Sequence, residues 1–408
     1  MRRRKRQGGT RAAWCLGAVL TLATPARAQE SIFNLPGFGL PVTAETMRGR
    51  ALGGAGLGLP GEAFSLDNPA QLARYSRAGL YLSLLGQRTR VEDIRASGNV
   101  TDVVFPTAQI VLPAWGASSV GLGFTQYLDF DAALESSTLF EGDTVPLALR
   151  SEGGIAILSP SLAYGVNGRT AVGLSLDVYL GSRELLRTAD FSGLEGGAVT
   201  TTDSLARDFR ALGLTVGAER QLGPVRLAAS WHLRPTIESE VTAASGPDRE
   251  GSAVQFDLPS ELTLGVTARI SADLVAAAAL RRAAWGETDL PGLSAEALED
   301  AIELGGGLEY APQAGLARVL GPETPLRLGY RWRRLPIVLE GEAVTEWTAS
   351  AGIGRGFGGR SRLDLVLETG RRGSVDSHGL SERFLRFGVG LSTFEQWRRD
   401  APAAPVTD

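Results

Sequence analysis

Arginine side chains recur at alternate positions of several extended segments, and a guanidinium in a dry pocket can bind a carboxylate through two parallel hydrogen bonds. The candidate carboxylate partners are Arg234, Arg327, Arg331 and Arg333. The alternative is that such arginines pair with acidic residues on neighbouring strands, as Arg386 and Asp364 would do. The sequence therefore indicates either a site for an anionic head group or a set of structural ion pairs.

Other chemistry has little support in the sequence. The two histidines, His232 and His378, are far apart, and the only cysteine is Cys15. The run from 352 to 358 is rich in glycine but continues into a strand, whereas a nucleotide-binding loop opens a helix. We therefore expect no metal site, no cofactor and no enzyme activity, and the acidic loops offer nothing to nucleic acid.

The arginines lie in segments where apolar and polar residues alternate. Leu328, Tyr330 and Trp332 are interleaved with Arg331 and Arg333, so an extended strand would have one apolar and one basic face. We place fourteen such strands, with twelve or sixteen as alternatives, at 80–91, 104–113, 119–131, 152–166, 170–190, 205–221, 225–243, 253–270, 273–287, 301–312, 325–337, 345–358, 361–374 and 381–394.

The N-terminus predicts export. Five basic residues at 2–6 precede an apolar run at 12–23 and an Ala-x-Ala triplet at 26–28, the pattern of a secretory signal peptide. Seven of the 41 Lys and Arg residues lie in 1–28, so residues 29–408 carry 34 basic against 45 acidic residues. No later segment has the eighteen or more apolar residues of a spanning helix. We expect a bacterial outer-membrane protein whose strands cross the lipid.

Loop lengths favour the same fold class, an all-β transmembrane antiparallel barrel. Tight connections at 114–118, 167–169 and 223–224 alternate with long ones at 132–151 and 191–204. Outer-membrane barrels sort their connections in this way, with the short turns periplasmic, whereas a soluble β-sandwich has no reason to do so. The predicted domains are a signal peptide at 1–28, an N-terminal hatch at 29–78, the barrel at 79–397 and a disordered tail at 398–408.

The hatch has its own signature. A glycine-rich run at 48–56 is followed by Ser65 and then by Asn68, Pro69 and Ala70 shortly before the first strand. Glycines at this density allow positive φ and close backbone contact, as a segment folded inside a narrow barrel requires. Its apolar residues could line a ligand path or simply fill the barrel, and the candidates are Phe33, Leu35, Phe38, Leu57 and Phe64.

With these features the sequence resembles the FadL family of outer-membrane transporters for long-chain fatty acids and other hydrophobic compounds. The resemblance rests on the run at 50–56, the Asn68-Pro69-Ala70 motif and the stretch at 258–266. It implies a hatch in the lumen, ligand capture outside and lateral exit beside a kinked third strand. Here Gly121 and Gly123 are the candidate positions for that bend.

The predicted function is passive transport of a hydrophobic, fatty acid-like small molecule by a monomeric barrel in contact with outer-membrane lipid. A related barrel family associated with secretion shares the same opening motif. The alternative is therefore a structural or secretion-associated barrel that binds proteins and keeps the hatch as a permanent seal.

Overall fold

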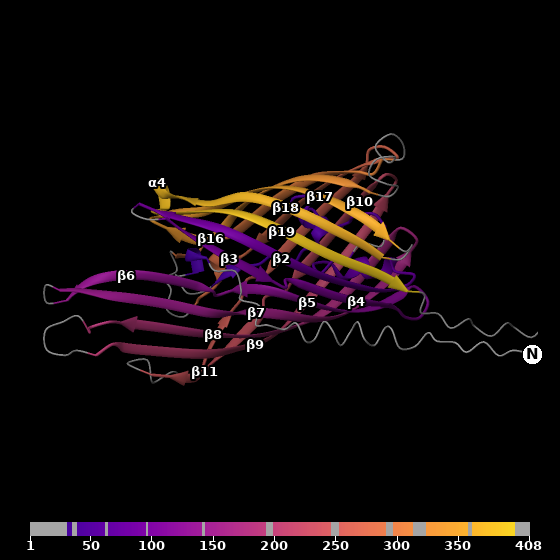
Figure 1. Ribbon diagram of the computed structural model, residues 1–408. Helices are drawn as coiled ribbons and strands as arrows, with labels where there is room; N and C mark the ends of the chain where they lie inside the picture. The colour runs from indigo at the N-terminus through magenta and orange to yellow at the C-terminus, as the bar shows by residue number, and fades with distance from the viewer. Residues whose placement is uncertain are drawn as a thin grey trace, which may run out of the picture.

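The wall of the molecule is one closed antiparallel sheet, seen as a tilted barrel in the computed structural model of Figure 1. The structure describes residues 31–34, 39–61, 64–94, 97–140, 143–192, 199–245, 253–290, 297–312, 324–357 and 361–395. The predicted signal peptide and tail, together with Leu35 and Phe38, lie outside these residues.

Fourteen antiparallel passes form the wall over the described residues, which confirms the predicted number. Ten are single strands: β2 (Ala78–Asp93), β7 (Asp143–Asn167), β8 (Thr170–Ala189), β9 (Thr201–Leu222), β14 (Leu274–Ala283), β15 (Ala301–Tyr310), β16 (Leu326–Leu339), β17 (Glu342–Phe357), β18 (Ser361–Ser374) and β19 (Leu380–Glu395). Four are interrupted: β3 (Ser97–Val104) with β4 (Thr107–Pro113), β5 (Ser118–Asp129) with β6 (Ala132–Phe140), β10 (Val225–His232) with β11 (Thr236–Ala244), and β12 (Val254–Asp257) with β13 (Glu261–Arg269).

The barrel closes where β19 pairs with β2, with Leu385 opposite Arg88 and Leu391 opposite Leu82. The tight turns at 168–169 and 223–224 lie at the end of the barrel where β2 begins and β19 ends. At the opposite end β6, β7, β8, β9 and β11 extend well beyond the rest of the wall (Figure 1). The predicted sorting of connections by length is met only in part, because β16 and β17 are joined at the opposite end by a two-residue turn at 340–341 and the connection from β15 to β16, at the end where β2 begins, runs from 311 to 325.

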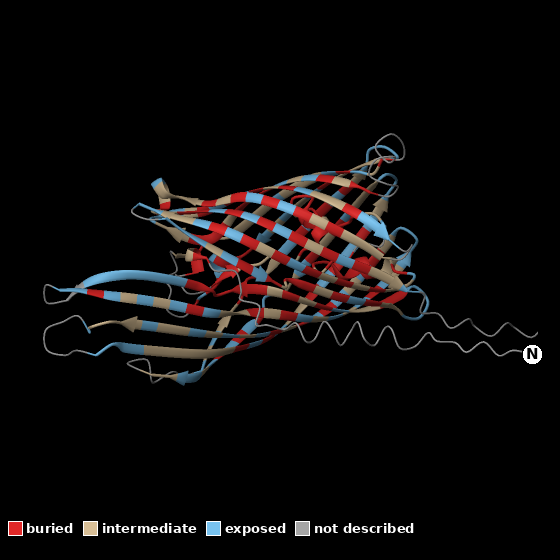
Figure 2. Ribbon diagram, in the orientation of Figure 1, coloured by how far each residue is buried: buried red, intermediate tan, exposed pale blue. Residues whose placement is uncertain are grey.

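Alternation in the sequence appears as alternation in burial along each strand (Figure 2). On β16, Leu328 is 67% exposed and Tyr330 is 54% exposed, whereas Arg327 and Arg331 are each 2% exposed. The apolar residues form the outer face and the arginines point inward, because successive side chains of a strand lie on opposite sides. The predicted inside and outside assignment of this strand is confirmed.

The N-terminal segment runs through the inside of the wall. Its short elements are η1 (Ile32–Asn34), β1 (Leu40–Pro41), α2 (Met47–Arg50) and η2 (Pro69–Arg74), and β1 pairs with β5. Within the described connections between wall strands lie two further short helices, η4 (Trp285–Glu287) and α4 (Val375–His378). Among the described residues, no helix is both long and apolar enough to cross a membrane.

The predicted long loop at 132–151 is wrong, because most of it forms the protruding hairpin of β6 and β7. Glu135, Ser136 and Thr138 of β6 are all exposed, so the segment has polar residues on both faces and no alternation. The second pass also begins earlier than predicted, since β3 precedes β4 and the pass is broken at 105–106.

Candidate functional site

The N-terminal segment, here called the hatch (31–77), is connected to the wall by ion pairs, and five of those among its described residues join largely buried side chains. Arg48 Nη2 lies 2.6 Å from Glu309 Oε1, Arg50 Nη2 lies 2.8 Å from Glu368 Oε2, and Glu45 Oε2 lies 3.4 Å from Arg331 Nη1. The other two join Asp67 to Arg281 and Arg74 to Glu219. Removing one partner of a buried pair leaves an uncompensated charge, so these pairs fix the hatch in one position.

Glycines of the wall form the surface against which the hatch lies. A methyl group placed on Gly265 would lie 2.5 Å from Leu57 Cβ, and one on Gly352 would lie 2.5 Å from Ala51 Cβ. At Gly305 the added carbon would collide with the carbonyl oxygen of Gly53, so backbone meets backbone there. Similar contacts with the hatch involve Gly79, Gly121, Gly173, Gly217, Gly307, Gly329, Gly388 and Gly390. The hatch is therefore in close contact with most of the barrel's circumference.

The Asn68-Pro69-Ala70 motif attaches the hatch to three strands. Asn68 caps η2, because its side-chain oxygen accepts a hydrogen bond from the Ala70 N–H at 3.0 Å. Its amide nitrogen donates to the carbonyl oxygens of Ala218 on β9 and Ala229 on β10, at 3.1 and 3.2 Å. Pro69 and Ala70 lie against Gly173 of β8. The motif thus serves as an anchor as well as a turn.

Each of the four candidate carboxylate partners is paired with an acidic residue of the protein. Arg327 donates to Glu309 and Asp364 at 2.6 and 2.8 Å, and Arg331 pairs with Glu45. Arg333 forms two hydrogen bonds of 2.9 Å to Glu346, and Arg234 pairs with Glu287 near the surface. These contacts favour the structural alternative for the arginines over a ligand-binding role.

The predicted pair of Asp364 and Arg386 is wrong. The register of β18 and β19 places Gly390 opposite Asp364 and Glu368 opposite Arg386. Arg386 accordingly lies 3.8 Å from Glu368, while Asp364 pairs with Arg327 and Arg362.

Three of the five candidate ligand-path residues are described, and all three are buried. Phe33 contacts Gly373, Leu57 contacts Gly265, and Phe64 lies in an aromatic group with Tyr75, Tyr81 and Phe394. Leu35 and Phe38 lie outside the described residues. The contacts of Leu57 and Phe64 with the wall show that these two side chains fill the barrel where they lie.

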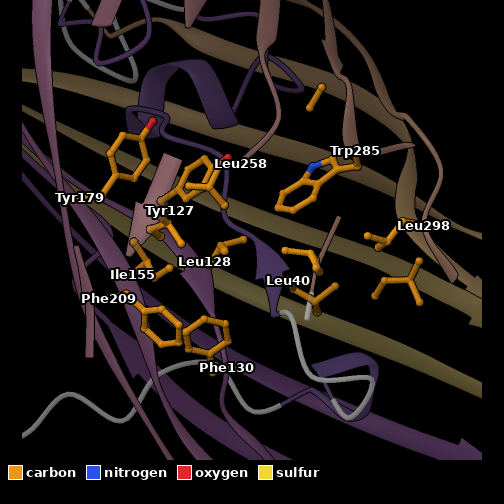
Figure 3. Close-up of a cluster of buried hydrophobic side chains, with 14 of the residues drawn as sticks. Leu40, Tyr127, Leu128, Phe130, Ile155, Tyr179, Phe209, Leu258, Trp285 and Leu298 are labelled. Atoms are coloured by element: carbon orange, nitrogen blue, oxygen red, sulfur yellow. The ribbon is translucent and has the colours of Figure 1, made fainter. Parts of the chain in front are cut away.

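An apolar group that the sequence did not predict occupies the interior near the protruding strands (Figure 3). Tyr127, Ile155, Tyr179 and Phe209 point inward from successive passes, and Leu40 of the hatch lies among them. Tyr127 and Tyr179 meet edge to face at 5.4 Å between ring centroids. The sequence contained an indication of this apolar group, because aromatic residues occupy strand positions whose side chains point inward, where polar residues were expected.

A polar chamber of about 70 Å³ lies between this group and the hatch. Asp177 accepts hydrogen bonds from Ser159 and Ser175 at 2.7 and 3.0 Å, and His232 Nδ1 lies 2.7 Å from Thr215 Oγ1. Burial raises the pKa of Asp67, and the nearby Arg281 offsets part of that rise. Over the described part of the chain, no three His, Cys, Asp or Glu side chains are arranged to hold a metal ion.

Among the described residues, the wall is unpaired between β3 and β6. Within that part of the chain β3 pairs with β2 and β6 pairs with β7, but the two strands do not pair with each other, although they belong to neighbouring passes. The third pass breaks at 130–131, and its register shifts between Gln126 and Leu128. The predicted bend at Gly121 and Gly123 is misplaced, since both lie in regular pairing with β4 and β7 and serve as contacts for the hatch.

A cavity of about 850 Å³ lies at this unpaired edge. Its lining combines apolar side chains such as Phe124 and Leu180 with the buried Asp131 and with further charged side chains, namely Arg150, Glu152, Arg183, Glu184, Arg207 and Asp208. Gln126 lines this cavity and also the polar chamber inside the barrel. Gln126 therefore stands between the interior and the outside of the wall.

These features define a closed fourteen-stranded antiparallel β-barrel with the fold of the FadL-type channels. The structure is similar to a Pseudomonas aeruginosa FadL homologue, with 12% identity, a TM-score of 0.60, and coverage of 87% of this chain and 99% of that one. The Ralstonia pickettii toluene transporter TbuX matches with 18% identity and a TM-score of 0.56, over 89% of this chain and 100% of that one.

The Pseudomonas putida toluene transporter TodX has 16% identity and a TM-score of 0.56, over 89% of this chain and 100% of that one. A family model described as BamG matches residues 214–400 of the sequence. No curated protein matches the sequence. At these identities the structural similarity establishes the fold.

Proposed function

We propose that this protein lies in the bacterial outer membrane and passes hydrophobic small molecules through its wall without a coupled energy source. The observation that carries the proposal is the unpaired edge between β3 and β6, where Gln126 lines both the interior chamber and the outer cavity. An apolar molecule held inside could pass to the lipid there without crossing the hatch. The similar solved structures include toluene transporters and a FadL homologue, which supports a hydrophobic substrate.

The membrane location is supported by the outer face of the wall. Large apolar side chains are exposed on strands all around the barrel, including Leu84 at 52%, Leu328 at 67% and Phe387 at 52%. A barrel with such a face is stable in lipid, because the closed sheet satisfies its backbone hydrogen bonds internally.

The path that we propose begins at the apolar group near the protruding strands and turns sideways at the break in the third pass. The hatch blocks the alternative route along the barrel axis, because ion pairs and wall glycines hold it around the circumference. The substrate class is a fatty acid or another small apolar molecule.

Uptake measurements in a strain that lacks the gene test this function. Radiolabelled toluene and a radiolabelled long-chain fatty acid are supplied to cells that carry the wild-type protein, Gln126→Trp, Gln126→Ala or the control Gln255→Trp. We expect Gln126→Trp to reduce uptake at least fivefold, because the indole would fill the passage, whereas Gln126→Ala and Gln255→Trp retain it. Gln255 is exposed on β12, away from the cavity. Uptake of both compounds that is independent of the gene would overturn the proposal.

A second candidate is a sealed barrel that binds other proteins. The observation that favours it is the fixed hatch. In that case deleting the gene leaves uptake unchanged, and the barrel purifies together with protein partners in stoichiometric amounts.

A further inference from the structure

A hollow of about 770 Å³ lies on the outer face of the barrel, across β9, β10, β13, β14 and β15. Its rim consists of large apolar side chains that point outward, namely Leu227, Leu264, Val266, Leu280 and Leu304, which are between 38% and 48% exposed. Small residues, Ala218, Ala229 and Ala278, line the surface between them. The hollow is thus an apolar groove in the part of the wall that would face lipid.

Strand register explains the groove. Ala218 on β9 lies opposite Ala229 on β10, and Ala278 on β14 lies opposite Gly306 on β15. Neighbouring strands therefore place small residues side by side, and these small side chains leave the space between the rim leucines unfilled. On the inner face of the same strands the hatch fills the space, since Leu57 contacts Gly265 and Gly53 contacts Gly305. The empty volume is consequently on the outside.

One end of the groove carries a positive charge. Arg220 and Thr170 lie opposite each other on β9 and β8, and both line the groove. Arg220 is exposed and lies three residues before the tight turn at 223–224, at the end of the barrel where β2 begins. Outer-membrane barrels have their short turns on the periplasmic side, so we take this end as periplasmic. An outward-facing arginine three residues from a periplasmic turn is expected at the depth of the phosphate groups of the inner leaflet.

We propose that the groove binds one phospholipid, with its acyl chains between the leucines and its phosphate at Arg220 and the Thr170 hydroxyl. The inference rests on the membrane location given under the proposed function and is independent of transport. An apolar groove that ends in a single cation matches an amphipathic anion in both shape and charge. A second barrel fits less well, because its convex wall would cover Arg220 with apolar side chains and leave the charge without a partner.

Native mass spectrometry of the purified full-length protein in detergent tests this inference, with palmitoyl-oleoyl phosphatidylglycerol as the probe. We expect the wild-type protein to bind a first lipid molecule with higher affinity than any further lipid molecule. Arg220→Gln should lower the affinity for this first lipid at least tenfold, because it removes the phosphate contact. Ala229→Phe should abolish the tighter binding of the first lipid, because the ring fills the groove. The matched control is Arg355→Gln, since Arg355 is an exposed arginine near the same end of β17, outside the groove.

Folding of each variant is checked by the shift in gel mobility on heating, and Ala229→Ser serves as the small substitution that keeps the groove open. Equal lipid binding by the wild type, Arg220→Gln and Ala229→Phe would overturn the inference. A wild-type dimer that Ala229→Phe converts to a monomer would also overturn it and would assign the groove to a second copy. Failure of the wild-type protein to insert into phosphatidylglycerol liposomes would instead contradict the proposed function itself.

Discussion

Arg50 of the hatch and Glu368 of β18 form an ion pair 2.8 Å long that is almost fully shielded from water, with side-chain exposures of 5% and 1%. The pair joins residues that are 318 positions apart in the sequence. Because both charges have lost their hydration, each depends on the other for compensation.

We predict that Arg50→Met destabilises the folded barrel by about 3 kcal/mol, since the nearest ion-pair partner that the described residues then leave to Glu368 is Arg386, at 3.8 Å. The double variant Arg50→Met with Glu368→Met should recover part of this loss, because it removes the uncompensated Glu368 charge but also takes Glu368 away from the buried Arg386. Urea unfolding in liposomes, followed by tryptophan fluorescence, measures both values. The control is Arg234→Gln at the exposed pair with Glu287, which should cost under about 0.5 kcal/mol. Equal effects at the two pairs would contradict the argument from burial.

The extent to which the sequence predicts this site depends on the kind of feature. Alternation along one strand was enough to place Arg331 inward and Tyr330 outward, because side-chain direction follows from strand geometry alone. Partners across strands depend on register, which the turns and the hatch fix together. For that reason the sequence indicated that Asp364 and Arg386 lie on neighbouring strands, but it could not show that Arg386 faces Glu368.

The features near the third pass escaped prediction for a different physical reason. β6 extends beyond the main part of the wall, so both of its faces are exposed and its residues need not alternate. Tyr127 and Tyr179 point inward, against the usual rule that a barrel interior is polar, because the apolar group there includes Leu40 of the hatch. These exceptions occur together, next to the unpaired edge that we propose as the exit.

Wall glycines that contact the hatch should not tolerate a side chain. In Gly352→Ala the new methyl group would lie 2.5 Å from Ala51 Cβ and 3.0 Å from the Leu365 carbonyl oxygen. We expect a loss of about 2 kcal/mol in unfolding free energy and faster proteolysis of the hatch, because this site has no room to relax. Gly168→Ala is the control, since no atom lies within 4 Å of an added methyl group there. A hatch that is equally protected in both variants would show that the close contact is unimportant.

Stability should fall as the pH rises through neutrality because of Glu45. Burial raises the pKa of this hatch carboxyl from 4.5 to about 7; Arg331 offsets only part of that rise, and the neighbouring Glu303 carboxylate adds to it. The folded state therefore holds a proton that the unfolded state releases. The contribution of Glu45 to the free energy of unfolding is thus complete below pH 4.5 and is lost as the pH rises through about 7.

Between pH 4.5 and pH 8 the unfolding free energy should fall by about 3 kcal/mol from this group. The glutamine in Glu45→Gln cannot ionise, so that variant should lose this part of the pH dependence while other groups keep theirs. Urea titrations of both proteins across this range provide the comparison. Parallel curves for the wild type and the variant would exclude Glu45 as the source.

The Asn68 side chain should contribute more to the free energy of unfolding than an ordinary helix cap does. It accepts from the Ala70 N–H and donates to the carbonyl oxygens of Ala218 and Ala229, so Asn68→Ala removes a cap and two hydrogen bonds to the wall. We expect a loss of about 2 kcal/mol, whereas an exposed cap alone contributes about 1 kcal/mol or less. Asn167→Ala supplies that reference, because Asn167 accepts from the Arg169 N–H at an exposed turn.

Asn68→Asp separates the two roles of the side chain. The aspartate keeps the oxygen that caps η2 but cannot donate to the wall, and its charge would lie beside two carbonyl oxygens. If anchoring to β9 and β10 is the main role, Asn68→Asp should destabilise the barrel at least as much as Asn68→Ala and should expose the hatch to protease. If the aspartate variant retains wild-type stability, the capping hydrogen bond alone accounts for the motif and the hatch is held by its ion pairs and glycine contacts.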